Sequence, residues 1–281
     1  MKVTGPSSTM LPAMRARQTG DTWPMTLMLA DGLVTATIEV AGGRLAQLSI
    51  RNVDVLVGAD PARDEMQWGS YAMVPWAGRI RRGRFTFDGV DYQLPINLGP
   101  HSIHGVGYLS TWEVAAATET SAELRLQLPT DERWPFGGTA HQRFDVTPGA
   151  VRLELGVIAG DRSMPVSFGW HPWFRKPDAI DFLPTAMYRR DSDYMAVDEL
   201  VEVPAGPWDD CFVNTKPVRV AIDGVNLQLS SDCTDWVVYD EPAHATCIEP
   251  QTGPPDAFNI RSRVLQPGEQ HSAWYLISIS S

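Results

Sequence analysis

Apolar and polar residues alternate along most of this 281-residue chain, and turns rich in Gly or Pro interrupt the alternation at short intervals. Segments 26–40 and 84–94 each carry the pattern around an Asp-Gly dipeptide, which suits the positive φ values of tight hairpin turns. No stretch sustains helical spacing of apolar residues over three turns. Such a chain can bury its apolar side chains by pairing strands and packing sheets face to face. The sequence therefore predicts an all-β fold, a large antiparallel β-sandwich.

The domain organisation is expected to be simple. Residues 1–24 are interrupted by Ser, Thr, Pro and Gly, which predicts a flexible N-terminal tail and does not match the apolar core of a signal peptide. No internal repeat, linker or change in composition divides the remainder. Residues 25–281 are therefore expected to form a single β-sandwich domain, a size that all-β domains reach as one unit.

Charge and cysteine content exclude several classes of partner. The net charge is −11 with acids and bases intermixed, whereas nucleic-acid binders concentrate basic residues in patches. No apolar run approaches the roughly 18 residues of a membrane-spanning helix. Three cysteines (Cys211, Cys233 and Cys247) without CxxC spacing argue against a disulfide framework and a zinc site. We expect a cytoplasmic protein with neither nucleic-acid nor membrane partners; the oligomeric state is left open.

Five segments break the alternation, and each combines Gly or Pro with an aromatic residue and an ionisable group. That composition is typical of a concave ligand site. The last segment, "CIEPQTGPPDAFN", is expected to lie outside regular sheet. The five are residues 71–85, 97–112, 167–177, 206–214 and 247–259.

Two histidines stand out in these segments. His171 precedes Pro172, which favours an extended backbone and a fixed side-chain direction. It is either a core histidine with one backbone bond or a general acid. His104 follows His101 in an H-x-x-H spacing, but the surrounding glycines exclude the helix on which that spacing would bind a metal. Surface polarity, a metal pair and a ligand contact all stay open for His104, and Gly105 after it would allow a ligand or neighbouring backbone to approach closely.

Three further positions carry charge. Arg79 lies between an aromatic-glycine segment and Ile80, so it is the arginine of its cluster expected to point inward, where five donors suit hydroxyls or a carboxylate. Of Asp209 and Asp210, one is expected to form a turn and the other to accept hydrogen bonds from hydroxyls. Glu249 either braces a loop or acts as a base, since desolvation lifts a carboxylate pKa toward neutrality.

Together, two imidazoles, an acid pair, an arginine and a candidate base among many tryptophans indicate carbohydrate recognition. Trp76 and Trp173 are candidates for stacking on a sugar ring. A glycoside hydrolase, which needs two facing carboxylates, would leave both histidines without a role. A non-catalytic carbohydrate-binding module would need neither the base nor the acidic imidazole.

The five segments, in this order, resemble the aldose 1-epimerase (galactose mutarotase) superfamily from about Thr26 to Ile279. The matching landmarks are "WAGRIRRGRFTFDGVDYQL", "HSIHGVGYLSTWEV", "FGWHPWF", "WDDCF" and "CIEPQTGPPDAFN". The resemblance implies the galactose mutarotase-like supersandwich and interconversion of hexose anomers without cofactor or metal. It further implies Glu249 as the base for the C1 hydroxyl, His171 as the acid for the ring oxygen, and substrate contacts from His104, Arg79 and Asp209.

The chain also departs from galactose-type members. Pro and Trp replace the usual asparagine before the arginine motif, "HGVGY" lacks a second consecutive glycine, and "GWHPWF" differs from H-x-Y-F-N. These differences indicate a divergent member and leave the sugar open. A hexose-6-phosphate or other anionic-sugar 1-epimerase is the alternative; its phosphate would need basic residues such as Arg79, Arg81, Arg82, Arg84 and Lys176.

Overall fold

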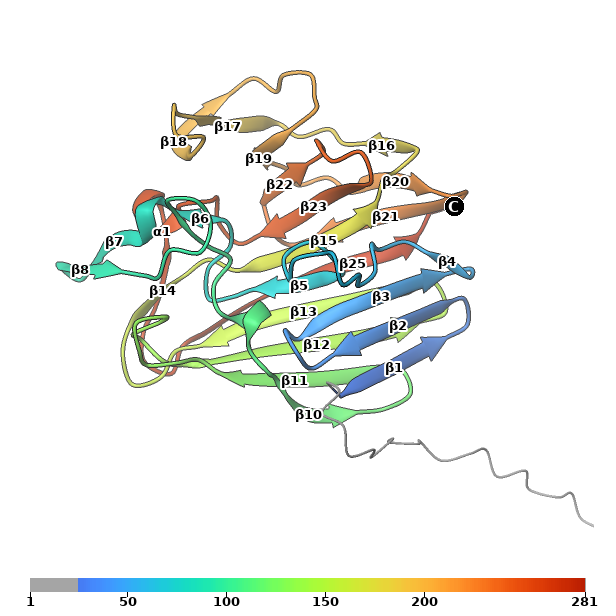
Figure 1. The fold of residues 1–281 in the computed structure, drawn as a ribbon, viewed down its shortest axis with the longest axis horizontal. Coiled ribbons are helices and arrows are strands. Elements are labelled where there is room, and N and C mark those ends of the chain that lie inside the picture. Colours follow the sequence, from blue (N-terminus) through green and yellow to red (C-terminus); the bar gives the residue numbers. More distant parts are fainter. Residues whose placement is uncertain (1–24, 281) are drawn as a thin grey trace, which may run out of the picture.

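The computed structural model describes residues 25–280, which form two large antiparallel sheets and several short ladders. The predicted all-β sandwich is thus confirmed, whereas the predicted tail lies outside the described residues and the single-domain prediction stays a prediction. The larger, 11-stranded sheet runs from one edge to the other (Figure 1) in the order β1 (Thr26–Asp31), β2 (Val34–Glu39), β3 (Arg44–Ile50), β5 (Ser70–Met73), β15 (Gly169–Arg175), β23 (Ala245–Gln251), β22 (Asp235–Tyr239), β19 (Asp209–Val213), β17 (Ala186–Arg190) and β18 (Ala196–Val201), with β4 (Val53–Asp54) paired to β3.

The second sheet lies behind the larger one and is built mostly from consecutive hairpins. Its strands follow the order β10 (Glu113–Ala117), β11 (Ser121–Gln127), β12 (Thr139–Thr147), β13 (Ala150–Ile158), β25 (Gln270–Ile279), β21 (Val225–Ser231), β20 (Val218–Ile222) and β16 (Ala179–Asp181).

Both predicted hairpins form. In the hairpin of β7 (Arg84–Phe87) and β8 (Val90–Gln93), Asp88 and Gly89 have φ values of 50° and 71°, the positive values that a two-residue turn matching the strand twist requires. In the β1–β2 hairpin, Asp31 pairs with Val34, so the turn lies one residue later than predicted.

The facing sides of the two sheets form one hydrophobic core. Trp170 of β15 packs against Tyr275 of β25 with ring centroids 5.9 Å apart, and Trp236 of β22 contacts the same tyrosine at 6.1 Å. All three side chains are almost completely buried. Burial of a large apolar side chain stabilises a fold by roughly 1.5–3 kcal/mol, so these contacts help to hold the layers together.

Short elements gather at one end of the sandwich, near the β7–β8 hairpin (Figure 1). Among the described residues the α-helical part is a single turn, and no helix there is long and apolar enough to cross a membrane. The short elements at this end are β6 (Arg79–Ile80), η1 (Arg81–Gly83), β9 (Ser102–Ile103), β14 (Met164–Val166), α1 (Ala257–Ile260) and β24 (Arg263–Leu265), whereas η2 (Gly107–Leu109) lies against β5.

One expectation about local structure is wrong. Glu249 does not lie in an irregular segment: it occupies β23, in the middle of the larger sheet, and is 2% exposed. Pro250 follows it, although proline lacks the N–H that a central strand normally donates. The strand tolerates Pro250 because the β15–β23 ladder is interrupted beside it, where Pro172 of β15 also lacks an N–H.

Candidate active site

The strand register brings His171 and Glu249 together. β15 pairs with β23 on both sides of the interrupted stretch, and the register is the same on each side. Continued across the gap, this register places His171 directly opposite Glu249. Opposed residues on neighbouring antiparallel strands have Cβ atoms about 4.5–5.5 Å apart, so their side chains meet.

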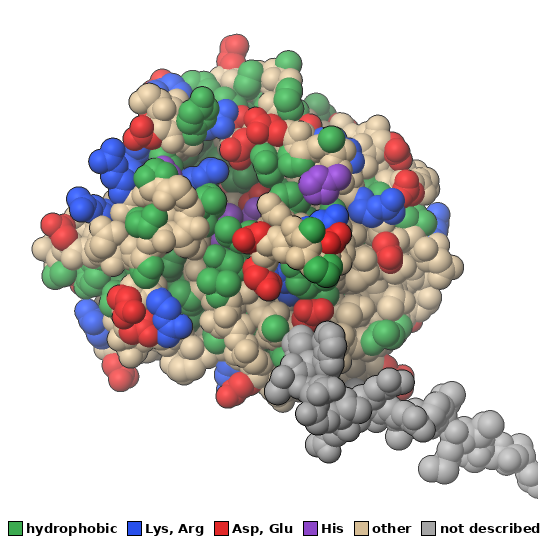
Figure 2. All heavy atoms as spheres, viewed as in Figure 1, with side chains coloured by type: hydrophobic (Ala, Val, Ile, Leu, Met, Phe, Trp, Pro, Cys, Tyr) green, Lys and Arg blue, Asp and Glu red, His purple; other side chains and the backbone are tan. Residues whose placement is uncertain are grey.

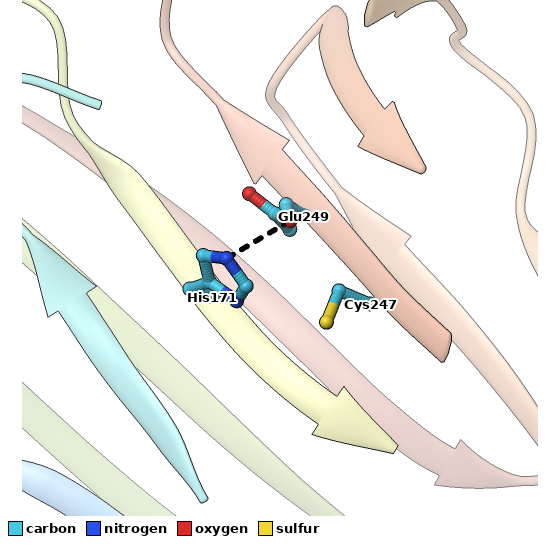
Figure 3. Close-up of side chains that lie close together, drawn as sticks. All are labelled: His171, Cys247 and Glu249. Atoms are coloured by element: carbon cyan, nitrogen blue, oxygen red, sulfur yellow. Dashed lines mark ion pairs between the residues drawn. The ribbon is translucent and has the colours of Figure 1, made fainter. Parts of the chain in front are cut away.

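The two side chains are in direct contact (Figure 3). His171 Nε2 lies 3.3 Å from Glu249 Oε1. The other carboxylate oxygen, Oε2, accepts a hydrogen bond of 3.3 Å from Gln251 Nε2, two residues along the same face of β23. The amide oxygen of Gln251 is buried and has no hydrogen-bond partner among residues 25–280. This orphaned acceptor therefore remains able to receive a hydrogen bond from a ligand.

This pair lies in a cavity of about 430 Å³. Figure 2 shows a hollow on this face where histidine and acidic side chains gather. The cavity brings together six of the seven predicted site residues: Arg79, His104, His171, Trp173, Asp209 and Glu249.

Trp76 is the exception. Its side chain does not line the cavity but is buried in the sandwich core, where its ring packs on Trp134 with centroids 5.8 Å apart. The expectation that Trp76 stacks on a sugar is therefore wrong. Local composition does not distinguish Trp76 from Trp173: Trp173 lies in β15, whereas Trp76 follows β5 and is bridged to Ser167, a partner far along the chain.

Aromatic rings fix the imidazole of His171. Tyr71, its cross-strand neighbour on β5, stacks with it at a centroid distance of 4.9 Å, and Trp173, two residues further along β15, does so at 5.5 Å. His104 meets it edge-on, with centroids 4.9 Å apart. The imidazole is thus held by packing, which limits the directions in which Nε2 can point.

His104 reaches this position through an unusual backbone. Its φ is 63°, a value that non-glycine residues seldom adopt, and Gly105 has a φ of 70°. Gly105 lies against the backbone of Val74, so the close approach that the sequence suggested is made by neighbouring backbone. His101 is engaged elsewhere, because its Nδ1 accepts a hydrogen bond from the Arg82 N–H. His101 and His104, the two histidines of the H-x-x-H spacing, therefore have different contacts.

Burial pulls both members of the pair toward their uncharged forms. Desolvation raises the pKa of Glu249 well above its ordinary value, and the negative charge of Asp209 raises it further, while Arg79 lowers it. Desolvation lowers the pKa of His171 to about 3, and the charges of Arg44 and Arg79 add to this effect. Burial therefore favours a protonated carboxyl group on Glu249 and a neutral imidazole on His171.

Asp209 and Asp210 have different surroundings. Asp209 lines the cavity, and its Oδ2 lies 3.8 Å from Arg79 Nη2 and 3.7 Å from Arg190 Nη1. Asp210 is buried beyond the cavity, with its Oδ1 2.8 Å from Arg190 Nε. Asp209 is therefore the member of the pair that is placed to meet a ligand.

Sequence reasoning missed a buried arginine behind the cavity wall. The guanidinium of Arg44 lies 4.1 Å from the Trp68 ring centroid and 5.0 Å from that of Tyr71. It also donates hydrogen bonds of 2.6 Å to the backbone carbonyls of Trp68 and Glu65. Arg44 thus fixes the loop that forms one wall of the cavity and the tyrosine that stacks on His171. The two glycines before Arg44 were the available signal, because they mark a close backbone approach.

A thiol completes a potential metal-ligand set. Ligand atoms of His171, Cys247 and Glu249 all lie within 4.8 Å of one another, and the three side chains are buried (Figure 3). Burial raises the pKa of Cys247 well above its ordinary value, which disfavours the thiolate that a metal would need. His171 Nε2 and Glu249 Oε1 also already contact each other, so a metal ion would have to separate them.

The backbone approach at Gly105 gives a stability prediction. A Cβ on Gly105 would collide with the Val74 carbonyl, whereas Gly89 has a similar positive φ but open space around it. Gly89→Ala should therefore cost about 1–2 kcal/mol for backbone strain alone. We expect Gly105→Ala to cost at least twice as much in the free energy of urea unfolding. Equal losses would show that the contact with Val74 is unimportant.

The buried pair also sets a pH dependence of stability. Between the ordinary pKa values of 4.5 for Glu and 6.5 for His, the folded and unfolded pair each hold one proton. Above pH 6.5 the unfolded chain loses this proton, so the unfolding free energy should fall by roughly 1 kcal/mol per pH unit until the pH passes the raised pKa of Glu249. Below pH 4.5 the unfolded chain binds a second proton, and stability should fall again toward about pH 3.

Glu249→Gln should remove the decline above pH 6.5, because the variant lacks the carboxyl group that retains the proton. Urea unfolding of both proteins from about pH 5 to about pH 8 tests this. Parallel stability curves for the two proteins above pH 6.5 would contradict the assignment.

Comparison with known proteins agrees with this geometry. Residues 25–278 match the sequence model of the family described as aldose 1-epimerase. The chain is 27% identical to the uncharacterized protein YihR of Escherichia coli K12, over 90% of this chain and 92% of that protein.

Solved structures support the same fold. The GalM/aldose epimerase homologue from C. elegans superposes with a TM-score of 0.80 at 18% identity, covering 92% of this chain and 99% of that one. Galactose 1-epimerase from Lactobacillus acidophilus gives a TM-score of 0.79 at 14% identity, covering 95% and 97%. Because the family match spans nearly all of the described residues, the chain belongs to the aldose 1-epimerase family.

Proposed function

We propose that this protein is an aldose 1-epimerase that interconverts the α and β anomers of a hexose. The observation that carries the proposal is the direct contact of His171 Nε2 with Glu249 Oε1 inside a cavity of about 430 Å³. A buried acid–base pair in a concave site is where general acid–base chemistry is expected. Mutarotation needs one proton donor and one proton acceptor and no other reagent.

The spacing of the pair suits this reaction. The C1 hydroxyl oxygen and the ring oxygen of a pyranose are bonded to the same carbon, so the groups that serve them must be neighbours. The two groups lie side by side on one sheet, with His171 Nε2 3.3 Å from Glu249 Oε1. A sugar above this sheet face can present both oxygens to the pair.

In the proposed mechanism Glu249 accepts the proton of the C1 hydroxyl while His171 donates a proton to the ring oxygen. The C1–O5 bond then breaks, leaving an open-chain aldehyde and a C5 hydroxyl. Rotation about C1–C2 exposes the other face of the aldehyde. The C5 oxygen attacks C1 as both protons return, so the net reaction consumes nothing.

The protonation state of the free site differs from the one that this mechanism uses. Burial favours the proton on Glu249 and the neutral form of His171. Transfer of that proton across the contact to Nε2 converts the pair into the carboxylate and imidazolium that the reaction needs. Hydroxyl groups of a bound sugar would favour the transfer, because they supply hydrogen bonds to the charged form.

The remaining predicted residues receive binding roles in this proposal. Trp173 lines the cavity beside His171 and offers an apolar contact to a sugar ring, and Arg79 and Asp209 offer donors and acceptors for sugar hydroxyls. His104 has a buried Nδ1 without a partner. The three unpaired cysteines agree with the cytoplasmic location that is part of this proposal.

The rival functions fit the site less well. A glycoside hydrolase uses two carboxyl groups across the scissile bond, but the ionisable group in contact with Glu249 is an imidazole. A non-catalytic binding module would have no use for a buried acid–base pair, which is costly to desolvate.

Replacing either member of the pair tests the chemistry. Glu249→Gln and His171→Asn should each lower kcat by about 10²–10⁴-fold, because each removes one proton-transfer group. Sugar binding should remain measurable by saturation-transfer NMR. Anomer exchange is followed by polarimetry or by NMR exchange between the two anomeric protons, with aryl glycosides as the control for hydrolase activity. Near-wild-type exchange in Glu249→Gln, or release of aglycone by the wild type, would refute the proposal.

The two neighbouring aspartates provide a matched test of binding. Asp209→Asn should raise KM by roughly tenfold with a smaller change in kcat, because a hydroxyl contact typically contributes about 1 kcal/mol. Asp210→Asn should lower stability, since it leaves Arg190 without its closest partner, but it should leave KM nearly unchanged. Steady-state kinetics and urea unfolding of both variants separate the two effects, and a larger KM change for Asp210→Asn would reverse the assignment.

A further inference from the structure

The cavity carries a strongly unequal set of charges. Its lining includes four acidic side chains, those of Asp64, Asp209, Glu241 and Glu249, but a single basic one, that of Arg79. Both histidines in the lining have pKa values lowered by burial, so they add no positive charge near neutral pH. Even with Glu249 protonated, the acids of the cavity outnumber its one base.

The basic residues near the cavity are already paired. Asp209 lies between Arg79 and Arg190, at 3.8 and 3.7 Å. Lys176 Nζ lies 2.7 Å from Asp240 Oδ1, and Arg81 Nη2 lies 2.6 Å from an oxygen of Asp191. An anionic substituent would therefore compete with these carboxylates for the same guanidinium and ammonium groups.

The other arginines of the predicted basic cluster are elsewhere. Arg82 and Arg84 line a separate, shallow hollow next to β8, and neither lines the cavity. The set of basic residues that a sugar phosphate would require is therefore dispersed by the fold.

Two of the acids have no neutralising partner. Asp64 Oδ1 accepts a hydrogen bond of 3.0 Å from the Met66 N–H, and within residues 25–280 neither Asp64 nor Glu241 forms an ion pair. Both are exposed at the cavity mouth. Asp64 lies in the loop that leads from β4 to β5, and Glu241 lies in the turn between β22 and β23. The two carboxylates thus flank the strands that carry the catalytic pair.

We infer that Asp64 and Glu241 determine the charge class of the substrate: the cavity accepts neutral and cationic aldoses, such as amino sugars, and rejects aldoses that carry a phosphate or sulfonate. This inference rests on the proposed function. It selects against the anionic-sugar alternative, because an anion in the cavity would lose its hydration and gain only repulsion from the two carboxylates. Asp64 and Glu241 lie on either side of the strands that carry His171 and Glu249. The repulsion therefore does not depend on which end of the sugar bears the anionic group.

The test compares three sugars that differ in charge. Anomer exchange of glucose, glucose 6-phosphate and protonated glucosamine is measured by NMR exchange spectroscopy at low ionic strength, after subtraction of the uncatalysed rate. We expect kcat/KM to fall in the order glucosamine, glucose, glucose 6-phosphate, with roughly a tenfold or larger gap between the last two. Added salt should narrow this gap, since screening shortens the Debye length from about 10 Å at 0.1 M to about 3 Å at 1 M.

The double variant Asp64→Asn/Glu241→Gln should reduce the preference for glucose over its phosphate by roughly tenfold. The Asn side chain keeps the oxygen that accepts from Met66, so the loop retains its bond. Asp88→Asn/Glu132→Gln is the control: both residues are exposed outside the cavity lining, and the change in net charge is the same. This control should retain the wild-type preference.

The outcomes separate the two proposals. Wild-type turnover of glucose 6-phosphate as fast as glucose, or an unchanged preference in the cavity variant, would overturn the charge inference and leave the epimerase proposal standing. Exchange of none of the three sugars, nor of galactose, mannose and fucose measured in the same way, would overturn both. A loss of preference in the surface control equal to that in the cavity variant would show that net charge, and not these two residues, is responsible.

Discussion

The contact between His171 and Glu249 depends on the register of β15 and β23, whose ladder is interrupted beside this pair but continues beyond it at both ends. The strands β15 and β23 keep one register before and after the stretch in which Pro172 and Pro250 lack N–H groups. A shift of one residue would turn one of the two side chains toward the sandwich core. The two proline-bearing segments must therefore be held in place by pairing beyond them, and by β5 and β22 on their outer sides.

Burial gives this contact its chemical character. In water a carboxylate and an imidazole would titrate at well-separated pH values; in the sheet, desolvation pushes the pKa of the carboxyl group up and that of the imidazole down. The result is a pair in which burial favours the protonated carboxyl group and the neutral imidazole. A reversible ring opening also requires a proton donor next to a proton acceptor. The burial that makes the charged forms of the two groups unfavourable therefore also prepares the pair for its proposed use.

The surroundings of the pair restrict what it can act on. Rings of Tyr71, Trp173 and His104 hold the imidazole, and the buried guanidinium of Arg44 holds Tyr71 and the wall beside it. These contacts leave an open face above the sheet for a flat, hydroxyl-bearing ring. In our proposal, the carboxylates of Asp64 and Glu241 at the cavity mouth select substrates by charge, whereas His171 and Glu249 transfer protons. Specificity and chemistry would then depend on different elements of the fold.

The sequence by itself determined the fold class and most of the site. Alternation and Asp-Gly turns specify antiparallel strands, because a side-chain period of two suits only a pleated sheet, and irregular segments marked six residues that line the cavity. It could not place Trp76 in the core or Glu249 within a strand, because the face and the pairing of a residue depend on partners far along the chain. The positions of Tyr71, Arg44 and Gln251 around the pair could not be predicted for the same reason. The fold pairs the arginines near the cavity with acids and, within residues 25–280, leaves Asp64 and Glu241 without an ion pair. The sequence could not predict this, since ion pairing depends on distances that sequence order does not set.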